Sequence, residues 1–72
     1  PKNVLYFSFD EIVFDLKDVL ESYQKMVLNK SFDETKGKIY VFLDEIQKVS
    51  DWENKLKTYY DIYPNIKFFI SG

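Results

Sequence analysis

The sequence contains no cysteine, no histidine and no arginine, and each absence excludes a kind of chemistry. Without cysteine the chain has no disulfide and no thiolate nucleophile. Without cysteine and histidine it cannot build a Cys/His zinc site, a Ser-His triad or an imidazole acid–base catalyst. Without arginine it offers no guanidinium fork for guanine or phosphate and no arginine finger.

Glycine and proline are also scarce, with 2 residues of each among 72. The chain is 46% hydrophobic and 19% aromatic, which argues against disorder, collagen and low complexity. Seventy-two residues make one domain at most. A chain this short buries only about 60% of its unfolded surface, so we expect marginal stability.

The charges are scattered, with 10 Lys against 12 Asp and Glu and a net charge of −2. The sequence lacks the basic stripe that is typical of a nucleic-acid surface. It also has no apolar run that approaches the ~20 residues of a membrane span. We see no signal peptide in the first residues and expect a cytoplasmic location. Abundant Lys, Ile, Asn and Tyr without Arg are typical of an AT-rich prokaryotic gene. Because the chain begins at Pro1 and stops at Ser71-Gly72, we expect a piece of a longer protein.

Apolar runs and amphipathic segments alternate along the chain in the order β-α-β-α-β. Short runs of β-formers predict strands, and apolar residues at i, i+3, i+4 and i+7 predict helices. The strands are expected over 4–9, 38–43 and 66–70, and the helices over 15–28 and 50–63. The fold class is therefore α/β, with a three-stranded parallel sheet, flanking helices and 38–43 as the central strand.

The helix ends also have sequence signals. Asp15 is the expected N-cap of the first helix, whose apolar stripe comprises Leu16, Val19, Leu20, Tyr23, Met26 and Val27. Ser50 and Glu53 have the spacing of a capping box for the second helix, which places Trp52, Leu56, Tyr59 and Tyr63 on one core-facing side. The segment 29–37 is polar and predicts a turn.

The pair Asp44-Glu45 is the candidate for chemistry. Four uninterrupted apolar residues, 40–43, lead straight into it. Ligands of parallel sheets bind at the carboxyl ends of the strands, where the other strands end in Asp10-Glu11 and Ser71-Gly72. Two adjacent carboxylates near phosphates are costly unless a divalent cation shares them, which predicts Mg²⁺. Alternatively, each acidic pair belongs to a solvated turn.

An apolar strand followed by Asp-Glu is the Walker B pattern of P-loop nucleotidases. Residues 39–72 closely resemble archaeal and bacterial ATPases of the AAA type. That group has a DEIQ-type Walker B motif, a following V-x-x-W-E segment and a strand that ends in [ST]-G. The corresponding residues here are 44–47, 49–53 and 71–72, and VLYFSFDE at 4–11 resembles the group's second strand.

The resemblance implies a role for three residues. Asp44 would be the magnesium residue, Glu45 would be the catalytic glutamate that positions water for attack on the γ-phosphate, and Ser71 would occupy or adjoin the sensor-1 position. The parent protein would bind and hydrolyse ATP with Mg²⁺. Within the DEIQ string, Gln47 receives no reaction role.

One large departure from the family is the missing Walker A loop, G-x-x-x-x-G-K-[ST], since the only glycines are Gly37 and Gly72. Without that loop the chain has no cradle for the phosphates. We therefore expect residues 1–72 to form a single partial domain, the second to fourth strands of a P-loop sheet. Alone it would bind neither ATP nor Mg²⁺ and would be inactive. The family's first strand would flank 66–70, so its absence predicts self-association through that bare edge.

Two other classes of protein fit the sequence less completely. One is a small, non-enzymatic α/β interaction domain in which Asp44-Glu45 is only a turn. The other is a phosphoacceptor domain like those of response regulators, with Asp10-Glu11 and Asp44 around a magnesium ion. The second lacks the expected Lys at the end of a later strand and leaves the DEIQ string unexplained.

Overall fold

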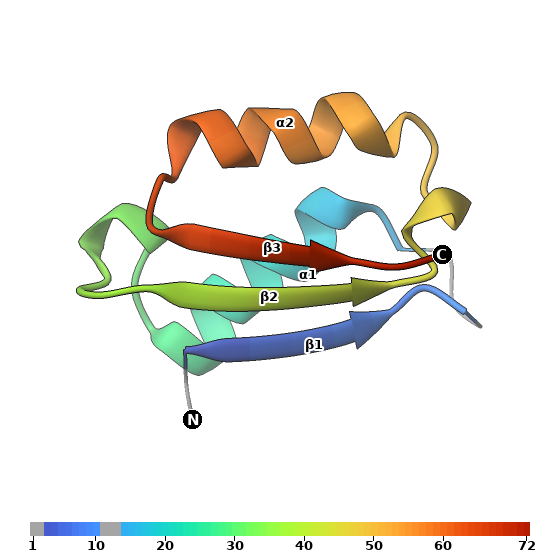
Figure 1. The fold of residues 1–72 in the computed structure, drawn as a ribbon. Coiled ribbons are helices and arrows are strands. Elements are labelled where there is room, and N and C mark those ends of the chain that lie inside the picture. Colours follow the sequence, from blue (N-terminus) through green and yellow to red (C-terminus); the bar gives the residue numbers. More distant parts are fainter. Residues whose placement is uncertain (1–2, 11–13) are drawn as a thin grey trace.

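The computed structural model describes residues 3–10 and 14–72. Along the chain Figure 1 shows strand, helix, strand, helix, strand, which confirms the predicted order. The main elements are β1 (Val4–Ser8), α1 (Leu16–Tyr23), β2 (Ile39–Asp44), α2 (Trp52–Ile62) and β3 (Ile66–Ile70). Single helical turns join them: the π-turn η1 (Gln24–Leu28) and the 3₁₀ turns η2 (Phe32–Glu34) and η3 (Ile46–Lys48).

The three described strands form one parallel sheet in the order β1-β2-β3. This confirms the α/β fold class and the central position of β2. Tyr6 lies opposite Phe42, which lies opposite Phe69, and Ser8 lies opposite Asp44. Because all strands run the same way, their carboxyl ends meet at one edge of the sheet.

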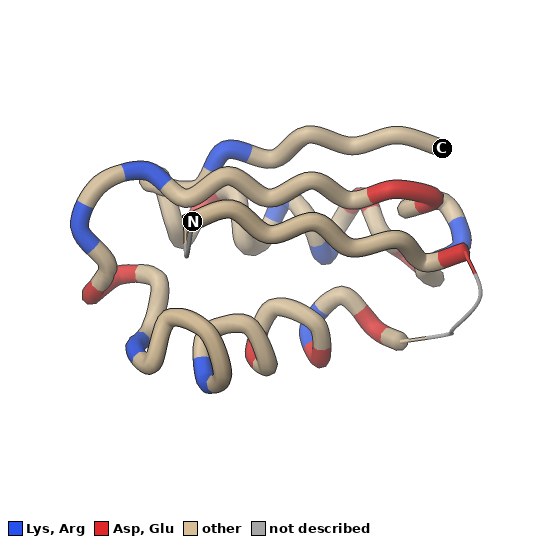
Figure 2. The backbone as a smooth tube through the Cα atoms, turned by 90° about the horizontal axis from the view of Figure 1, so that it is seen from below, with Lys and Arg blue, Asp and Glu red and all other residues tan. Residues whose placement is uncertain are grey.

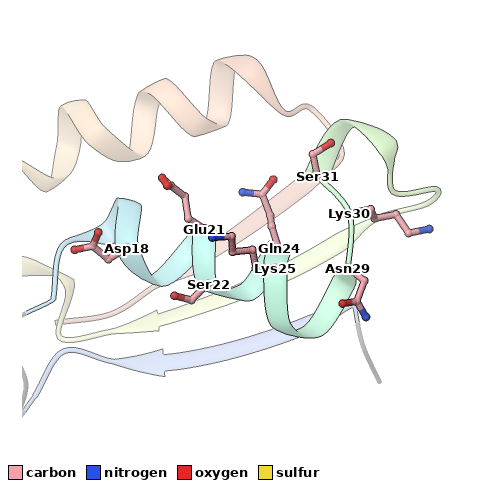
Figure 3. Close-up of a pocket in the computed structure, with 8 residues that line it drawn as sticks. All are labelled: Asp18, Glu21, Ser22, Gln24, Lys25, Asn29, Lys30 and Ser31. Atoms are coloured by element: carbon pink, nitrogen blue, oxygen red, sulfur yellow. The ribbon is translucent and has the colours of Figure 1, made fainter.

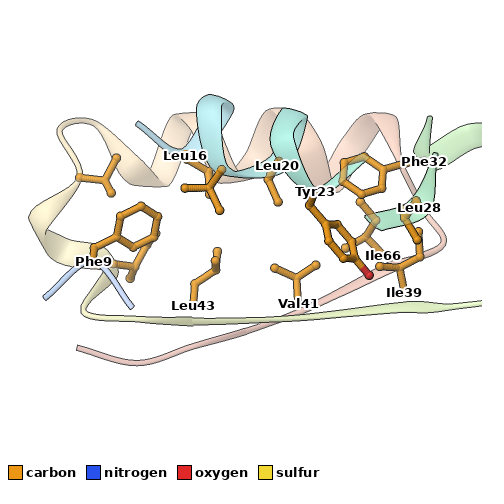
Figure 4. Packing of buried hydrophobic residues seen from close by; sticks show 13 residues of the cluster. Phe9, Leu16, Leu20, Tyr23, Leu28, Phe32, Ile39, Val41, Leu43 and Ile66 are labelled. Carbon is orange, nitrogen blue, oxygen red and sulfur yellow. The ribbon is translucent and has the colours of Figure 1, made fainter. Parts of the chain in front are cut away.

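The core lies between the sheet and α1, as Figure 4 shows. Alternate side chains of β2 point into it, and Ile39, Val41 and Leu43 are buried. Apolar residues of α1 and of the connecting turns meet them from the other side. The buried cluster comprises Phe9, Leu16, Val19, Leu20, Tyr23, Leu28, Phe32, Ile39, Val41, Leu43, Ile46, Val49 and Ile66. As expected, Trp52, Leu56, Tyr59 and Tyr63 of the second helical segment pack against this cluster, each partly buried.

The opposite face of the sheet is aromatic and open among the described residues. In Figure 1, α1 lies behind the sheet and α2 runs along its β3 side. Tyr6, Tyr40, Phe42 and Phe69 are exposed, and the rings of Phe42 and Phe69 stack with centroids 4.7 Å apart. The apolar strand runs indicate cover on both faces, whereas the described helices cover only one.

The first helix differs from the prediction in its second half. It is α-helical only to Tyr23 and continues as the π-turn η1. A π-turn advances by a smaller angle per residue than an α-helix, so the apolar stripe changes register there. Leu28 is buried, while Met26 is 78% exposed and Val27 40% exposed. The prediction that Met26 and Val27 belong to the core-facing stripe is therefore wrong.

The capping box expected at Ser50 and Glu53 is also wrong. Asp51 has a left-handed backbone conformation (φ 55°), so α2 begins at Trp52 and Ser50 lies outside the capping position. A capping box forms instead at η2, where the Ser31 N–H donates to Glu34 Oε1 at 3.2 Å. At α1, Asp15 is the N-cap residue as expected, but its carboxylate pairs with Lys55 at 3.2 Å instead of capping the helix.

The polar turn at 29–37 contributes an unpredicted core residue. Phe32 is fully buried in η2 and packs against Tyr63 with ring centroids 5.2 Å apart. The side-chain amide of Asn65 donates to the Phe32 carbonyl at 3.0 Å. Phe32 therefore fixes this connection against the start of β3.

Replacing Leu20 by Ala is expected to lower the free energy of unfolding by about 2–5 kcal/mol, because the side chain is fully buried between α1 and the sheet. Met26→Ala, on the exposed side of η1, is the matched control and is expected to cost less than about 0.5 kcal/mol. Urea unfolding of the two variants measures both effects. Equal losses would contradict the assignment of the core.

Candidate functional site

The acidic pair lies where the three strands end. Asp44 is the last residue of β2, Ser8 is its partner on β1, and Ser71 directly follows β3. Figure 2 shows acidic residues gathered at this edge of the sheet. The structure thus brings together Asp44, Glu45 and Ser71, the three site residues of the sequence prediction.

The Asp44 carboxylate is held mainly through one of its two oxygens. Asp44 Oδ1 accepts hydrogen bonds from the Ser71 hydroxyl at 2.7 Å and from the Glu45 N–H at 3.0 Å. Asp44 Oδ2 has only a long contact, 3.4 Å, with the Tyr6 hydroxyl. Oδ2 is therefore the oxygen with capacity for a further ligand.

These contacts change the ionisation of the residues that make them. The hydrogen bond from Ser71 is the main cause that lowers the pKa of Asp44 below its ordinary value, with the Glu45 N–H adding to it. The negative charge of Asp44 in turn raises the pKa of Tyr6. Asp44 is thus an ionised carboxylate, and Tyr6 a neutral donor, at neutral pH.

Ser71 is fixed against the end of β2 by three hydrogen bonds. Besides its hydroxyl bond to Asp44, its N–H donates to the Leu43 carbonyl at 3.0 Å, and its carbonyl accepts from the Ile46 N–H at 3.2 Å. The end of β3 therefore cannot shift without disturbing the carboxylate of Asp44.

Glu45 has a backbone conformation that is uncommon for a residue with a side chain. Its φ of 57° and ψ of 38° lie in the left-handed region, and the chain turns there from β2 into η3. Such outliers cluster at functional sites. The Glu45 carboxylate accepts a hydrogen bond from the side-chain amide of Gln47 at 2.7 Å.

Among residues 3–10 and 14–72, Lys48 adjoins these acids. Lys48 Nζ donates to both Asp10 Oδ1 and the Asp10 carbonyl at 3.0 Å, which joins η3 to the end of β1. The bond to Asp10 is the main cause that raises the pKa of Lys48. Asp10 is therefore in an ion pair. Glu11, its companion in the predicted pair, lies outside the described residues.

Two hollows differ in their chemistry. One of about 310 Å³ lies on the open face of the sheet and reaches from Phe42 and Phe69 to Asp44 and Ser71. A larger one, about 670 Å³, lies along α1 and η1 and is shown in Figure 3. Its lining mixes acids, lysines and amides, and its Gln24 already accepts the Phe32 N–H at 2.9 Å. The smaller hollow is lined by two of the three predicted site residues, Asp44 and Ser71, and Glu45 is not part of its lining.

Comparison with known proteins adds a family to this geometry. Residues 1–72 match the family described as AAA domain. The chain belongs to this family. It is also 39% identical over 64 residues to an uncharacterized protein of Methanocaldococcus jannaschii, a match that covers 85% of this chain and 13% of that protein. The chain thus spans about an eighth of the length of this relative. No solved structure matches the chain.

The AAA domain family is one of P-loop-type ATPases, so a magnesium ion is the implied cofactor. Residues 3–10 and 14–72 contain no group of three or more potential ligand side chains. Mg²⁺ commonly uses one or two carboxylates, with water and substrate phosphates completing its shell. Asp44 fits that demand, because it is ionised and its Oδ2 has only the long contact with Tyr6.

The helices of this AAA chain were also compared with the length and hydropathy of a membrane span. Among residues 3–10 and 14–72, none of them meets both requirements.

Two neighbours of the acidic pair in this AAA domain, Tyr6 and Lys48, were not predicted from the sequence. Because side chains alternate along β1, Tyr6 lies on the same face of the sheet as Ser8. Its hydrogen bond to Asp44, however, depends on the register between β1 and β2. Lys48 pairs with Asp10, 38 positions away in the sequence. No local pattern could have identified either contact.

Ser71→Ala is expected to raise the pKa of Asp44, because it removes the hydrogen bond that chiefly lowers it. Because that pKa is lowered in the folded chain, the bond stabilises the fold above the unfolded-state pKa, and the benefit is lost as the pH falls through the folded value. Carboxyl-detected NMR titration measures the pKa. Ser50→Ala, at an exposed turn position, is the control. An unchanged Asp44 titration would contradict the Ser71 contact.

Proposed function

We propose that this chain is the Walker B portion of an ATP-hydrolysing AAA unit in a longer protein, extending through the strand that leads to sensor 1. The observation that carries the proposal is the hydrogen bond between Ser71 and Asp44, which joins the ends of β3 and β2. A polar residue fixed beside an ionised carboxylate at the carboxyl edge of a parallel sheet is a suitable place for a metal-bound phosphate.

In this proposal Asp44 holds the magnesium ion of Mg-ATP through its Oδ2 side, with water between them. The ion would supply positive charge that neutralises the phosphate oxygens during transfer. Ser71 keeps the Asp44 carboxylate oriented and ionised. As the sensor-1 residue, its hydroxyl would also face the γ-phosphate.

Glu45 is proposed as the residue that orients the attacking water and accepts its proton. Its carboxylate follows Asp44 directly at the left-handed turn after β2, and, unlike Asp44, it does not line the hollow on the open face. This arrangement allows Asp44 to serve the metal while Glu45 serves the water.

The phosphate cradle is proposed to come from another part of the longer protein. The chain contains two glycines, Gly37 and Gly72, and no G-x-x-x-x-G-K-[ST] loop. The matched relative is several times longer than this chain. We therefore expect the 72 residues alone to bind neither ATP nor Mg²⁺ tightly and to be inactive. We also propose that the protein acts in the cytoplasm of a prokaryote.

In the full-length protein, Glu45→Gln is expected to lower ATP turnover by about 100-fold or more, because the amide cannot accept a proton. ATP affinity should stay within about threefold, since Glu45 is not proposed to bind the nucleotide. Asp44→Ala should weaken Mg²⁺-dependent ATP binding as well. Steady-state kinetics and equilibrium ATP binding measure these effects.

Glu53→Gln, on the exposed first turn of α2, is the control for both variants. If Glu45→Gln and Asp44→Ala hydrolyse ATP at the normal rate, the ATPase assignment fails. The chain would then be an α/β interaction domain.

We further propose that β3 is a pairing edge. It is hydrogen-bonded to β2 on one side, has no second strand partner among the described residues, and is rich in apolar side chains. Exposed apolar edge strands pair with other chains. The 72-residue chain by itself is therefore expected to self-associate through residues 66–70.

Sedimentation equilibrium of the 72-residue chain should show a mean mass that rises with concentration. Phe69→Lys, which places a charge at an exposed position of β3, should reduce the association. Lys67→Glu keeps a charge at a neighbouring exposed position and is the control. A monomer mass independent of concentration would overturn this proposal.

A further inference from the structure

We infer that Gln47 is a positioning residue for Glu45, and that the missing side chain at Gly72 provides the space in which Gln47 does this. The inference rests on the proposed function, in which Glu45 activates water. It adds a role for Gln47, which had none in the sequence prediction, and a link between the end of β3 and the proposed catalytic carboxylate.

The contact between Gln47 and Glu45 is short and local. Gln47 Nε2 lies 2.7 Å from Glu45 Oε1, the distance of a strong, charge-assisted hydrogen bond. The turn that brings the two side chains together is closed by a backbone bond from the Lys48 N–H to the Glu45 carbonyl, 3.2 Å long. The amide thus limits the rotation of a carboxylate that starts from an unusual backbone conformation.

Gly72 lies against the other side of the same amide. A Cβ atom at position 72 would overlap Gln47 Oε1, and it would lie 2.9 Å from Gln47 Cδ and 3.3 Å from Glu45 Cα. The Gln47 amide therefore fills the space between the Glu45 carboxylate and the backbone of Gly72. Any side chain at position 72 would displace the amide, and the φ of 145° at Gly72 would add backbone strain.

An amide is chemically suited to this task. It donates a hydrogen bond to a carboxylate and does not titrate, so it orients Glu45 without competing for the proton that Glu45 is proposed to accept. The described titratable groups around Glu45 are Asp44 before it, Lys48 in η3 and Asp10, which is paired with Lys48. The side chains of the segment 71–72 after β3 carry no charge.

The test uses the full-length protein and separates kcat from KM. Gln47→Ala is expected to lower kcat about 10- to 100-fold with the KM for ATP unchanged, because the base is misplaced while binding is intact. Gly72→Ala should give a similar loss by displacing the amide. The double variant should be no slower than Gln47→Ala alone, since both changes act through one contact.

A variant of the same shape distinguishes the hydrogen bond from the mere presence of a side chain at position 47. Gln47→Glu keeps the shape of the side chain and sets a second carboxylate against Glu45. The new side chain cannot donate the hydrogen bond and its like charge repels the Glu45 carboxylate, so kcat should fall at least as far as in Gln47→Ala, with the KM for ATP unchanged. Gln24→Ala is the matched control: it removes the other glutamine and its bond to Phe32, which should reduce stability and leave kcat unchanged.

The outcomes separate the two levels of the proposal. If Glu45→Gln retains turnover, the proposed function itself fails. If Glu45→Gln is inactive while Gln47→Ala has a kcat at or above the wild-type value, the function stands and the positioning role is overturned. A parallel change in kcat and KM, a normal kcat in Gln47→Glu, or additive losses in the double variant would overturn it too.

Discussion

Burial of one side of β2 is the constraint on which the rest of the structure depends. This side of the strand consists of Ile39, Val41 and Leu43, which are buried in the core. Because side chains alternate along a strand, the residues between them face outward. Because this packing fixes the backbone up to its last residue, Asp44 leaves the sheet on the open face and Glu45 follows at a turn. A core built from aliphatic side chains thus sets the position of two charged groups at its edge.

The polar edge is organised by contacts between strand ends that are distant in sequence. Ser71 connects β3 to β2 through its backbone and hydroxyl, and Lys48 connects η3 to Asp10 after β1. Each carboxylate has a different kind of partner: a hydroxyl for Asp44, an amide for Glu45 and an ammonium for Asp10. The three carboxylates therefore have different environments. Differences of this kind allow carboxylates in one site to have different roles.

The sequence predicted what depends on local periodicity, and failed where geometry is set by tertiary packing. The strand order, the central strand and the gathering of Asp44, Glu45 and Ser71 at one edge followed from apolar runs and parallel topology. Hydrophobic spacing could not reveal that η1 changes the helical register and leaves Met26 outside. The hydrogen bond from Gln47 depends on the left-handed turn at Glu45. No residue type in that stretch predicts such a turn.

The left-handed conformation of Glu45 has a consequence for how this chain would change under selection. An L-residue there costs roughly 1–2 kcal/mol relative to a relaxed backbone, whereas glycine adopts it freely. Folding alone would favour glycine at this position. A library screened only for thermal tolerance would therefore tend to lose the acid, while one screened for the proposed ATP turnover should retain it. The residue at position 45 would then indicate whether a lineage had been selected for stability or for the proposed turnover.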